Sequence, residues 1–324
     1  MHTIHSRIHS HDDADRFWRK QYSWLAEQGY TLRPKYMTSW AKTGMAMTSA
    51  GVAVPDLKQG VAIDAIRTID GKLVALKRVC VDASVGEFSL ACYFNALKYS
   101  ARNHCVPVFD VLPIPDEERE VLIVMPLLRT FDEPRFETFG ETIAFFTQLF
   151  EASGIAHRHI MMDATPLYPH AFDPLNPTMR RDWQGKAKPR SRTKQPVRYY
   201  FVDFAHARSG HTWDSSVTQA RYAADVYDLG DMLRTNFFNK YDGFEFMYPL
   251  LADMLEPDPA KRPSAERLYA HFLMARAQLS SAKSRSRLIE RGGEPALTAA
   301  YRNCRHWLLT VGRLLLGVPA VPDA

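Results

Sequence analysis

The sequence predicts an α+β protein built in two parts, a small sheet-plus-helix part followed by a mostly helical part. Between residues 61 and 125 the apolar residues fall in short runs rich in β-branched side chains, which is typical of strands. After Pro126 they recur at helical spacing over longer segments. A chain of 324 residues is long enough to bury two such cores.

The N-terminal region, residues 1–50, is expected to be an extension that is partly mobile. Its histidines indicate a solvated tail rather than a metal site, because no carboxylate or cysteine framework surrounds them. Apolar spacing predicts one helix over residues 14–29, with Gly29 as its stop. Residues 31–42 are expected to be irregular and to pack on the domain that follows.

Residues 51–128 are expected to form the small lobe, a sheet with one helix. Extended runs at 61–66 and 73–79 flank Asp70-Gly71, which favours a hairpin with a two-residue turn. A helix is expected over 87–99, with further strands at 104–108 and 121–125.

Residues 129–280 predict the helical lobe, with helices at 139–152, 224–238, 246–255 and 264–279. Ser264 is placed to cap the last of these helices. A basic insert, residues 179–198, holds eight Lys or Arg against one Asp and lacks apolar periodicity, so an exposed loop is expected. Residues 281–324 form a basic tail with a helix that packs on the lobe or on a partner.

Charge, cysteines and hydropathy limit the function classes. A net charge of +5 is too small to indicate nucleic-acid binding alone. Four scattered cysteines without a Cys-x-x-Cys pair favour a reducing intracellular compartment, cytoplasmic or nuclear. The N-terminus lacks the apolar core of a signal peptide. The late apolar run 307–318 is shorter than the roughly 20 residues that span a bilayer, so no transmembrane segment is expected.

One buried strand over Tyr199–Val202 is predicted to deliver Asp203 at its end, followed by Phe204 and Ala205. An Asp after an apolar run is more often a turn or helix-cap residue, so this motif needs support from others. The sequence holds these in order, and they are Val74-Ala75-Leu76-Lys77, Val124-Met125-Pro126-Leu127-Leu128, Asp225-Val226-Tyr227-Asp228-Leu229-Gly230 and Asp258-Pro259-Ala260-Lys261-Arg262-Pro263.

Together these motifs resemble a protein kinase over residues 61–279. Residues 24–40 and 126–140, Ile160-Met161-Met162-Asp163 and the basic insert resemble most of all the kinase-domain proteins abundant in mushroom-forming fungi, which are of serine/threonine type. The resemblance implies a bilobal protein-kinase-like fold that uses ATP and Mg²⁺. It implies that Lys77 contacts the phosphates and pairs with Glu87, and that Asp203 holds the metal. The segment Val124–Leu128 would be the gatekeeper and hinge whose backbone holds adenine, with Met125 and Leu127 as its cofactor-binding residues.

The catalytic loop is degenerate relative to the kinase pattern. It reads His157-Arg158-His159, so the Asp that accepts the substrate proton and the Asn that binds a second metal are both missing. Loss of a general base alone costs about 10²–10⁴ in rate. No Gly-x-Gly-x-x-Gly covers the phosphates, and Ala205 replaces a glycine. These losses indicate either a decayed kinase or a mispredicted gene model.

Three functions therefore stay open. The first is a pseudokinase with residual ATP binding and weak or absent phosphoryl transfer. The second is an active serine/threonine kinase in which His159, or a carboxylate elsewhere in the chain, replaces the missing base. The third is a non-enzymatic interaction module whose insert, residues 179–198, meets nucleic acid, acidic proteins or anionic lipid. A loop that serves only solubility is the plainer interpretation of that insert.

Overall fold

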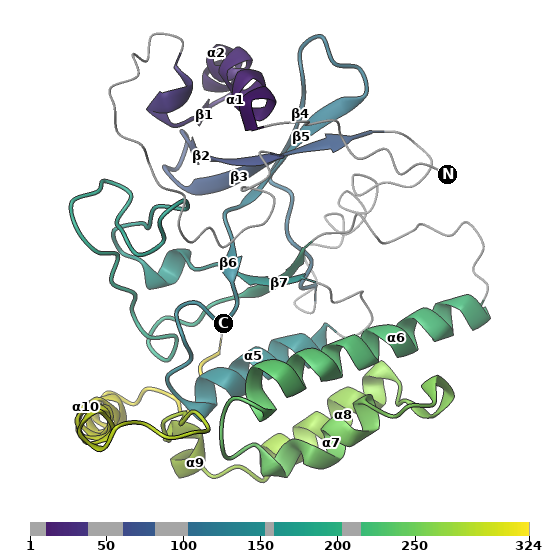
Figure 1. The fold of residues 1–324 in the computed structure, drawn as a ribbon, viewed down its shortest axis with the longest axis vertical. Helices are drawn as coiled ribbons and strands as arrows, with labels where there is room; N and C mark the ends of the chain where they lie inside the picture. Colours follow the sequence, from purple (N-terminus) through teal and green to yellow (C-terminus); the bar gives the residue numbers. More distant parts are fainter. Residues whose placement is uncertain (1–10, 38–60, 82–102, 153–158, 203–214, 324) are drawn as a thin grey trace. The chain divides into compact units, whose positions relative to one another are not determined.

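The computed structural model of the chain describes residues 11–37, 61–81, 103–152, 159–202 and 215–323. These residues form a mixed α+β structure of antiparallel sheet and helices (Figure 1), which confirms the predicted class at that level. The chain divides into two compact units. The first contains Met1–Thr130, Met161–Lys188 and Val202–Ser209, and the second contains Phe131–Ile160, Pro189–Phe201 and Gly210–Ala324.

The described strands are β1 (Tyr30–Thr31), β2 (Ala62–Arg67), β3 (Leu73–Cys80), β4 (Asp110–Pro113), β5 (Glu120–Pro126), β6 (Arg129–Thr130), β7 (His159–Met162) and β8 (Tyr199–Val202). The described α-helices are α1 (His11–Lys20), α2 (Tyr22–Glu27), α5 (Phe139–Glu151), α6 (Ser215–Leu233), α7 (Tyr248–Met254), α8 (Ala265–Ala277), α9 (Ser281–Arg285) and α10 (Ala296–Leu315). Short turns of 3₁₀-helix are η1 (Pro34–Tyr36), η2 (Thr165–Leu167), η4 (Glu245–Met247) and η5 (Pro259–Lys261), and η3 (Arg234–Phe238) is a π-helical turn.

The main sheet has five strands in the order β1-β2-β3-β5-β4, and all of its neighbours are antiparallel. The predicted strands at 61–66, 73–79 and 121–125 are confirmed as β2, β3 and β5. The predicted two-residue turn was wrong, because Arg67 N–H donates to the carbonyl of Lys72 and closes a longer loop. Gly71 lies in that loop at a φ of +68°, a conformation that glycine adopts without strain. A second sheet has three short strands in the order β6-β7-β8.

The strand predicted at 104–108 was also wrong, since the strand of this region is β4, which begins at Asp110, and Cys105 makes only an isolated bridge. Cys105, Val106 and Val108 are nevertheless buried. Val108 packs with Val79 of β3 and with β5 in a small apolar cluster. The apolar run therefore reflects burial without a continuous ladder, and Pro107 has no N–H to donate to one.

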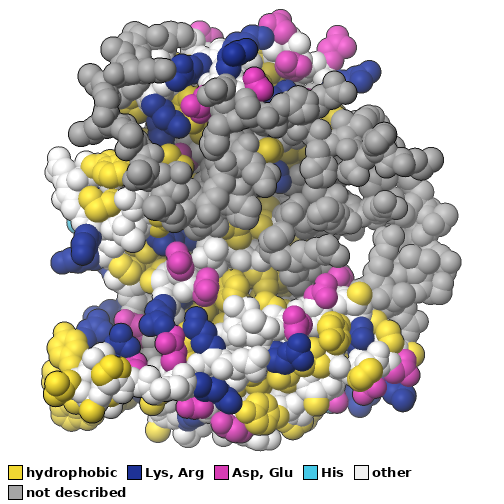
Figure 2. All heavy atoms as spheres, in the orientation of Figure 1, with side chains coloured by type: hydrophobic (Ala, Val, Ile, Leu, Met, Phe, Trp, Pro, Cys, Tyr) yellow, Lys and Arg dark blue, Asp and Glu magenta, His cyan; other side chains and the backbone are white. Residues whose placement is uncertain are grey.

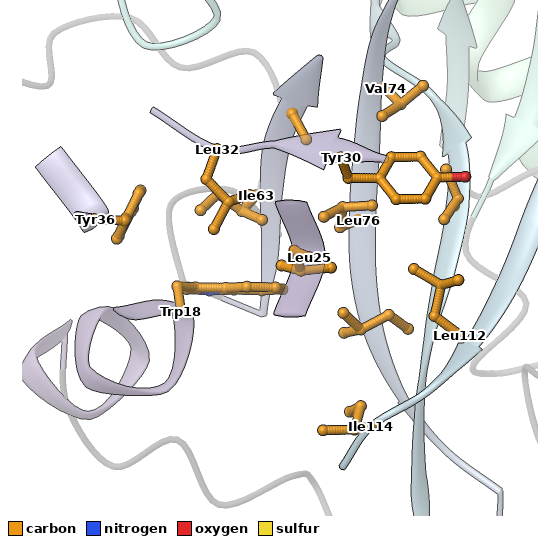
Figure 3. Packing of buried hydrophobic residues seen from close by; sticks show 13 residues of the cluster. Trp18, Leu25, Tyr30, Leu32, Tyr36, Ile63, Val74, Leu76, Leu112 and Ile114 are labelled. Atoms are coloured by element: carbon orange, nitrogen blue, oxygen red, sulfur yellow. The ribbon is translucent and has the colours of Figure 1, made fainter. Parts of the chain in front are cut away.

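One face of the main sheet packs against the N-terminal helices. Trp18 of α1 and Leu25 of α2 are both buried among side chains of β2, β3, β4 and β5 (Figure 3). The single helix expected over 14–29 is broken at Gln21 into two. Residues 31–37 pack on this core as expected, with Leu32 and Tyr36 buried in it.

The second unit has an aromatic core. Phe145 and Phe146 of α5 contact Phe237 of the π-helical turn η3, with ring centroids 5.6 and 4.8 Å apart. Phe244 joins them from the loop before η4. Predicted helices at 139–152 and 264–279 are confirmed as α5 and α8, and Ser264 caps α8 by accepting from Arg267 N–H.

The basic insert is exposed over much of residues 182–190, as the sequence predicted, but Arg192, Thr193 and Val197 are buried. Within the second unit, Arg192 is 2 % exposed and donates to the carbonyl of Phe131 at 2.9 Å. Thr193 is buried and donates from both its N–H and its hydroxyl to the carboxylate of Glu141 on α5. The insert was predicted to be solvated because of its many cations. At least one of these cations, Arg192, instead holds the insert through its hydrogen bond to Phe131.

Helix α10 turns its polar side inward. Arg313 is 4 % exposed and donates to Glu137 and Ser191, and His306 bonds the carbonyl of Arg285. The opposite side exposes apolar side chains (Figure 2), including Leu297, Trp307, Leu308 and Leu315. No helix among the described residues is both long and apolar enough to cross a membrane.

Candidate functional site

Lys77 lies in the middle of the main sheet, on β3. The register places Lys77 directly opposite Ile123 of β5, and Ala75 opposite Met125. Residues opposite each other in an antiparallel ladder project from the same face, so these four side chains share one face of the sheet. It is the face away from the N-terminal helices, because Val74 and Leu76 point into that core.

The described neighbours of Lys77 on this sheet face are mainly apolar. Val79, Val108 and Ile123 form a buried cluster on this face, with Met125 packed against it. Lys77 itself is only partly exposed. An ammonium on an apolar sheet face can contact the phosphates of a ligand whose flat apolar part lies on Ala75 and Met125. Leu127 is 3 % exposed and lies in the short connection between β5 and β6.

A buried carboxylate shares this face. Asp64 of β2 lies opposite Ala75, and Ala62 lies opposite Lys77. Asp64, Ala75 and Met125 therefore form one row across β2, β3 and β5. The side chain of Asp64 is 3 % exposed, so this end of the row is filled by the protein itself.

Two arginines neutralise Asp64. Arg33 donates from Nε to Asp64 Oδ1 at 2.7 Å, and Arg181 donates from Nη1 to Asp64 Oδ2 at 2.8 Å. Arg33 also donates to Asp173, whose Oδ2 accepts from the indole of Trp183 at 3.2 Å. Burial opposes the charge on Arg33, yet the two carboxylates hold its pKa above the ordinary value. A ligand on the Lys77 face has to fit between Met125 and this network.

The sequence did not single out the four charged residues of this network. Asp64 was counted as one member of an extended run, and Arg181 as one of the cations of a solvated insert. One available signal was a carboxylate in the middle of an otherwise apolar strand, because a charge is rarely buried without a partner. The local sequence pattern could not predict that Arg33 and Arg181 are the partners of Asp64.

Several predicted site residues fall outside the described residues, namely Glu87, His157, Arg158 and Asp203. His159 is the first residue of β7, for which only the backbone is described. The structure therefore brings together Lys77 and Met125, and places Leu127 one residue past the end of β5. Among the residues that the structure describes, no group of His, Cys, Asp and Glu is arranged to hold a metal ion.

The late arginine motif has a defined structural role in the second unit. Arg262 donates to the carbonyl of Ala223 on α6 at 2.7 Å and to the carbonyl of Glu256 at 2.7 Å. Its guanidinium also lies over the ring of Tyr227, 4.8 Å from the centroid. Backbone carbonyls and an aromatic ring thus satisfy this arginine and connect η5 to α6.

Comparison with protein-family models gives no match for this chain, and comparison with curated proteins also gives none.

Proposed function

We propose that this chain is a pseudokinase, a protein of bilobal kinase-like fold in which phosphoryl transfer is weak or absent. The observation that carries the proposal is the row Asp64–Ala75–Met125 beside Lys77. Lys77 stands on the third strand of an antiparallel sheet, as the kinase-like motif requires, and Met125 stands beside it on the same face. Asp64 and its two arginines take up part of the surface where a nucleotide would lie.

The sequence supports the loss of transfer independently. The loop His157-Arg158-His159 has neither the Asp that accepts the substrate proton nor the Asn that binds metal. Each missing group reduces the rate, and losses within one catalytic unit do not add simply. ATP and Mg²⁺ remain the ligands to test, with Lys77, Glu87 and Asp203 as the residues that would hold them.

The first experiment measures ATP binding. The melting temperature of the purified chain is recorded against ATP concentration, with and without Mg²⁺, because binding to the native state raises it. We expect a small rise that is lost in Lys77→Ala and retained in Lys72→Ala, a lysine just before the same strand with its side chain 64 % exposed. Asp203→Asn should lose only the metal-dependent part. Circular dichroism checks that each variant folds.

The second experiment measures transfer. The chain is incubated with labelled ATP, Mg²⁺ and a generic basic protein substrate. We expect incorporation no greater than that of Lys77→Ala. Incorporation well above that level, and lost in Lys77→Ala, would instead establish the active serine/threonine kinase. Absence of any ATP-dependent rise in melting temperature would remove residual nucleotide binding from the proposal.

A further inference from the structure

The basic insert contains a cavity that the proposed function does not use. Residues 178–187 form a hairpin, in which Arg180 N–H donates to the carbonyl of Gly185 and Ala187 N–H donates to the carbonyl of Thr178, both at 2.9 Å. A cavity of about 310 Å³ lies against this hairpin. The residues that matter in its lining are Tyr168, His170, Arg180, Gln184, Lys186 and Lys188.

The lining is cationic. Arg180, Lys186 and Lys188 carry positive charge, and no Asp or Glu of the described chain lines the cavity. One carboxylate lies close by, since Arg180 Nη2 donates to Asp182 at 2.5 Å and is neutralised by it. Neither Lys186 nor Lys188 has an ion pair with any residue that the structure describes. The cavity therefore keeps an excess of positive charge.

Arg180 also offers an unused donor. Its Nε is buried and has no hydrogen-bond partner within the described ranges. A buried donor without an acceptor is unfavourable, and more so on a charged group. An anion in the cavity would supply that acceptor.

Residues next to the cavity lining hold the hairpin in place. Arg181, the neighbour of Arg180, points the other way and donates to the buried Asp64 at 2.8 Å. Trp183 is likewise fixed, through its indole N–H to Asp173. Tyr168 is 7 % exposed, and its hydroxyl accepts from Arg129 Nη1 at 2.9 Å. These contacts fix Tyr168 and the hairpin that carries Arg180, and a fixed support favours recognition of a small ligand.

We propose that this cavity is a binding site for a small phosphorylated molecule that carries two linked phosphate groups. The volume is at the lower end of the range for small-molecule sites. Arg180 offers a charged N–H in a fixed direction, while Lys186 and Lys188 act as adjustable point charges. The site is separate from the one assigned to ATP, because none of its lining residues belongs to the sheet face of Lys77.

Calorimetric titration of the full chain with inorganic pyrophosphate tests this proposal, at low and at physiological ionic strength. We expect saturable one-to-one binding that the double variant Lys186→Gln/Lys188→Gln weakens by about tenfold or more. The control Lys194→Gln/Lys240→Gln removes the same charge from exposed lysines outside the cavity and should bind as the wild type does. Arg180→Lys, which keeps the charge and loses Nε, should weaken binding by a smaller factor.

Two further measurements distinguish binding in this cavity from binding elsewhere on the chain. Lys77→Ala should leave the affinity for pyrophosphate unchanged. If Lys77→Ala loses this affinity while Lys186→Gln/Lys188→Gln binds normally, the ligand binds elsewhere and the proposal is overturned. Equal weakening by both double variants would reduce the effect to net charge and would also overturn it. A short single-stranded RNA that binds more tightly than pyrophosphate, with a steep salt dependence, would identify the hairpin as a nucleic-acid surface instead.

Discussion

Asp64 lies directly opposite Ala75 in the β2–β3 ladder and accepts hydrogen bonds from Arg33 and Arg181 at 2.7 and 2.8 Å. Removal of one member of a buried charged network leaves its partners buried without compensation, which costs about 3–5 kcal/mol. We therefore expect Asp64→Asn to lower the free energy of unfolding by about that amount. The measurement is urea denaturation followed by circular dichroism and tryptophan fluorescence.

Asp116→Asn is the matched control for this substitution. The side chain of Asp116 is 84 % exposed and lies 3.9 Å from Lys20, and such exposed pairs contribute little. Its φ of 64° is tolerated by Asn as well as by Asp. An equal effect of both substitutions would show that the Asp64 network contributes no more to stability than an exposed pair does.

The Asp64 network also shows which part of this molecule a sequence can predict. Strands β2, β3 and β5 and helices α5 and α8 were predicted because periodicity and a Ser264 cap are local signals. The hydrogen bonds of Asp64 connect residues 31 and 117 positions apart, and no local pattern encodes such pairs. The sequence predicted that Lys77 lies on a strand of the sheet. It did not predict that the buried carboxylate of Asp64 lies on the same face.

Gly230 of α6 and Gly312 of α10 offer a direct test of the helix packing in the second unit. Alanine normally stabilises a helix interior by about 1 kcal/mol relative to glycine. A Cβ at Gly230 would lie 2.9 Å from Cβ of Met254, which is fully buried and fixed close to its own backbone. A Cβ at Gly312 would meet nothing within 4 Å.

We expect opposite signs from these two substitutions. Gly230→Ala should destabilise the chain by about 1–3 kcal/mol through overpacking between α6 and α7. Gly312→Ala should stabilise α10 by about 1 kcal/mol or less. Denaturant midpoints compare the two directly, and a stabilising Gly230→Ala would contradict the close approach of α6 to Met254.

The outward apolar side of α10 predicts that the protein associates with itself at high concentration. Leu308 and Leu315 are 60 % and 84 % exposed, and contiguous exposed apolar side chains favour association. The variant Leu308→Gln/Leu315→Gln should reduce concentration-dependent association in light scattering. Its free energy of unfolding should stay within about 0.5 kcal/mol of the wild type, because surface substitutions are usually neutral.

Leu268→Gln on α8 is the control for that pair, since Leu268 is 1 % exposed and its replacement should destabilise the fold. If the α10 variant unfolds as readily as Leu268→Gln does, the two leucines are covered in solution and the outward orientation of this face is wrong.

Cys105 should be nearly inert toward alkylating reagents in the folded chain. It is 4 % exposed, and burial raises the pKa of its thiol to about 12. Only the thiolate reacts, so at mildly alkaline pH the shift alone slows the reaction about 10³-fold relative to an ordinary cysteine. Cys80 and Cys304 are exposed free thiols and serve as internal references. Iodoacetamide labelling followed by peptide mass spectrometry should show early modification at these two positions and very slow modification at Cys105.

Unfolding provides the control for the labelling of Cys105. In concentrated urea Cys105 should react as fast as Cys80 and Cys304, because unfolding removes the burial that suppresses its thiolate. Rapid labelling of Cys105 under native conditions would mean that the segment before β4 opens readily, and that its apolar side chains do not stay packed against β3 and β5.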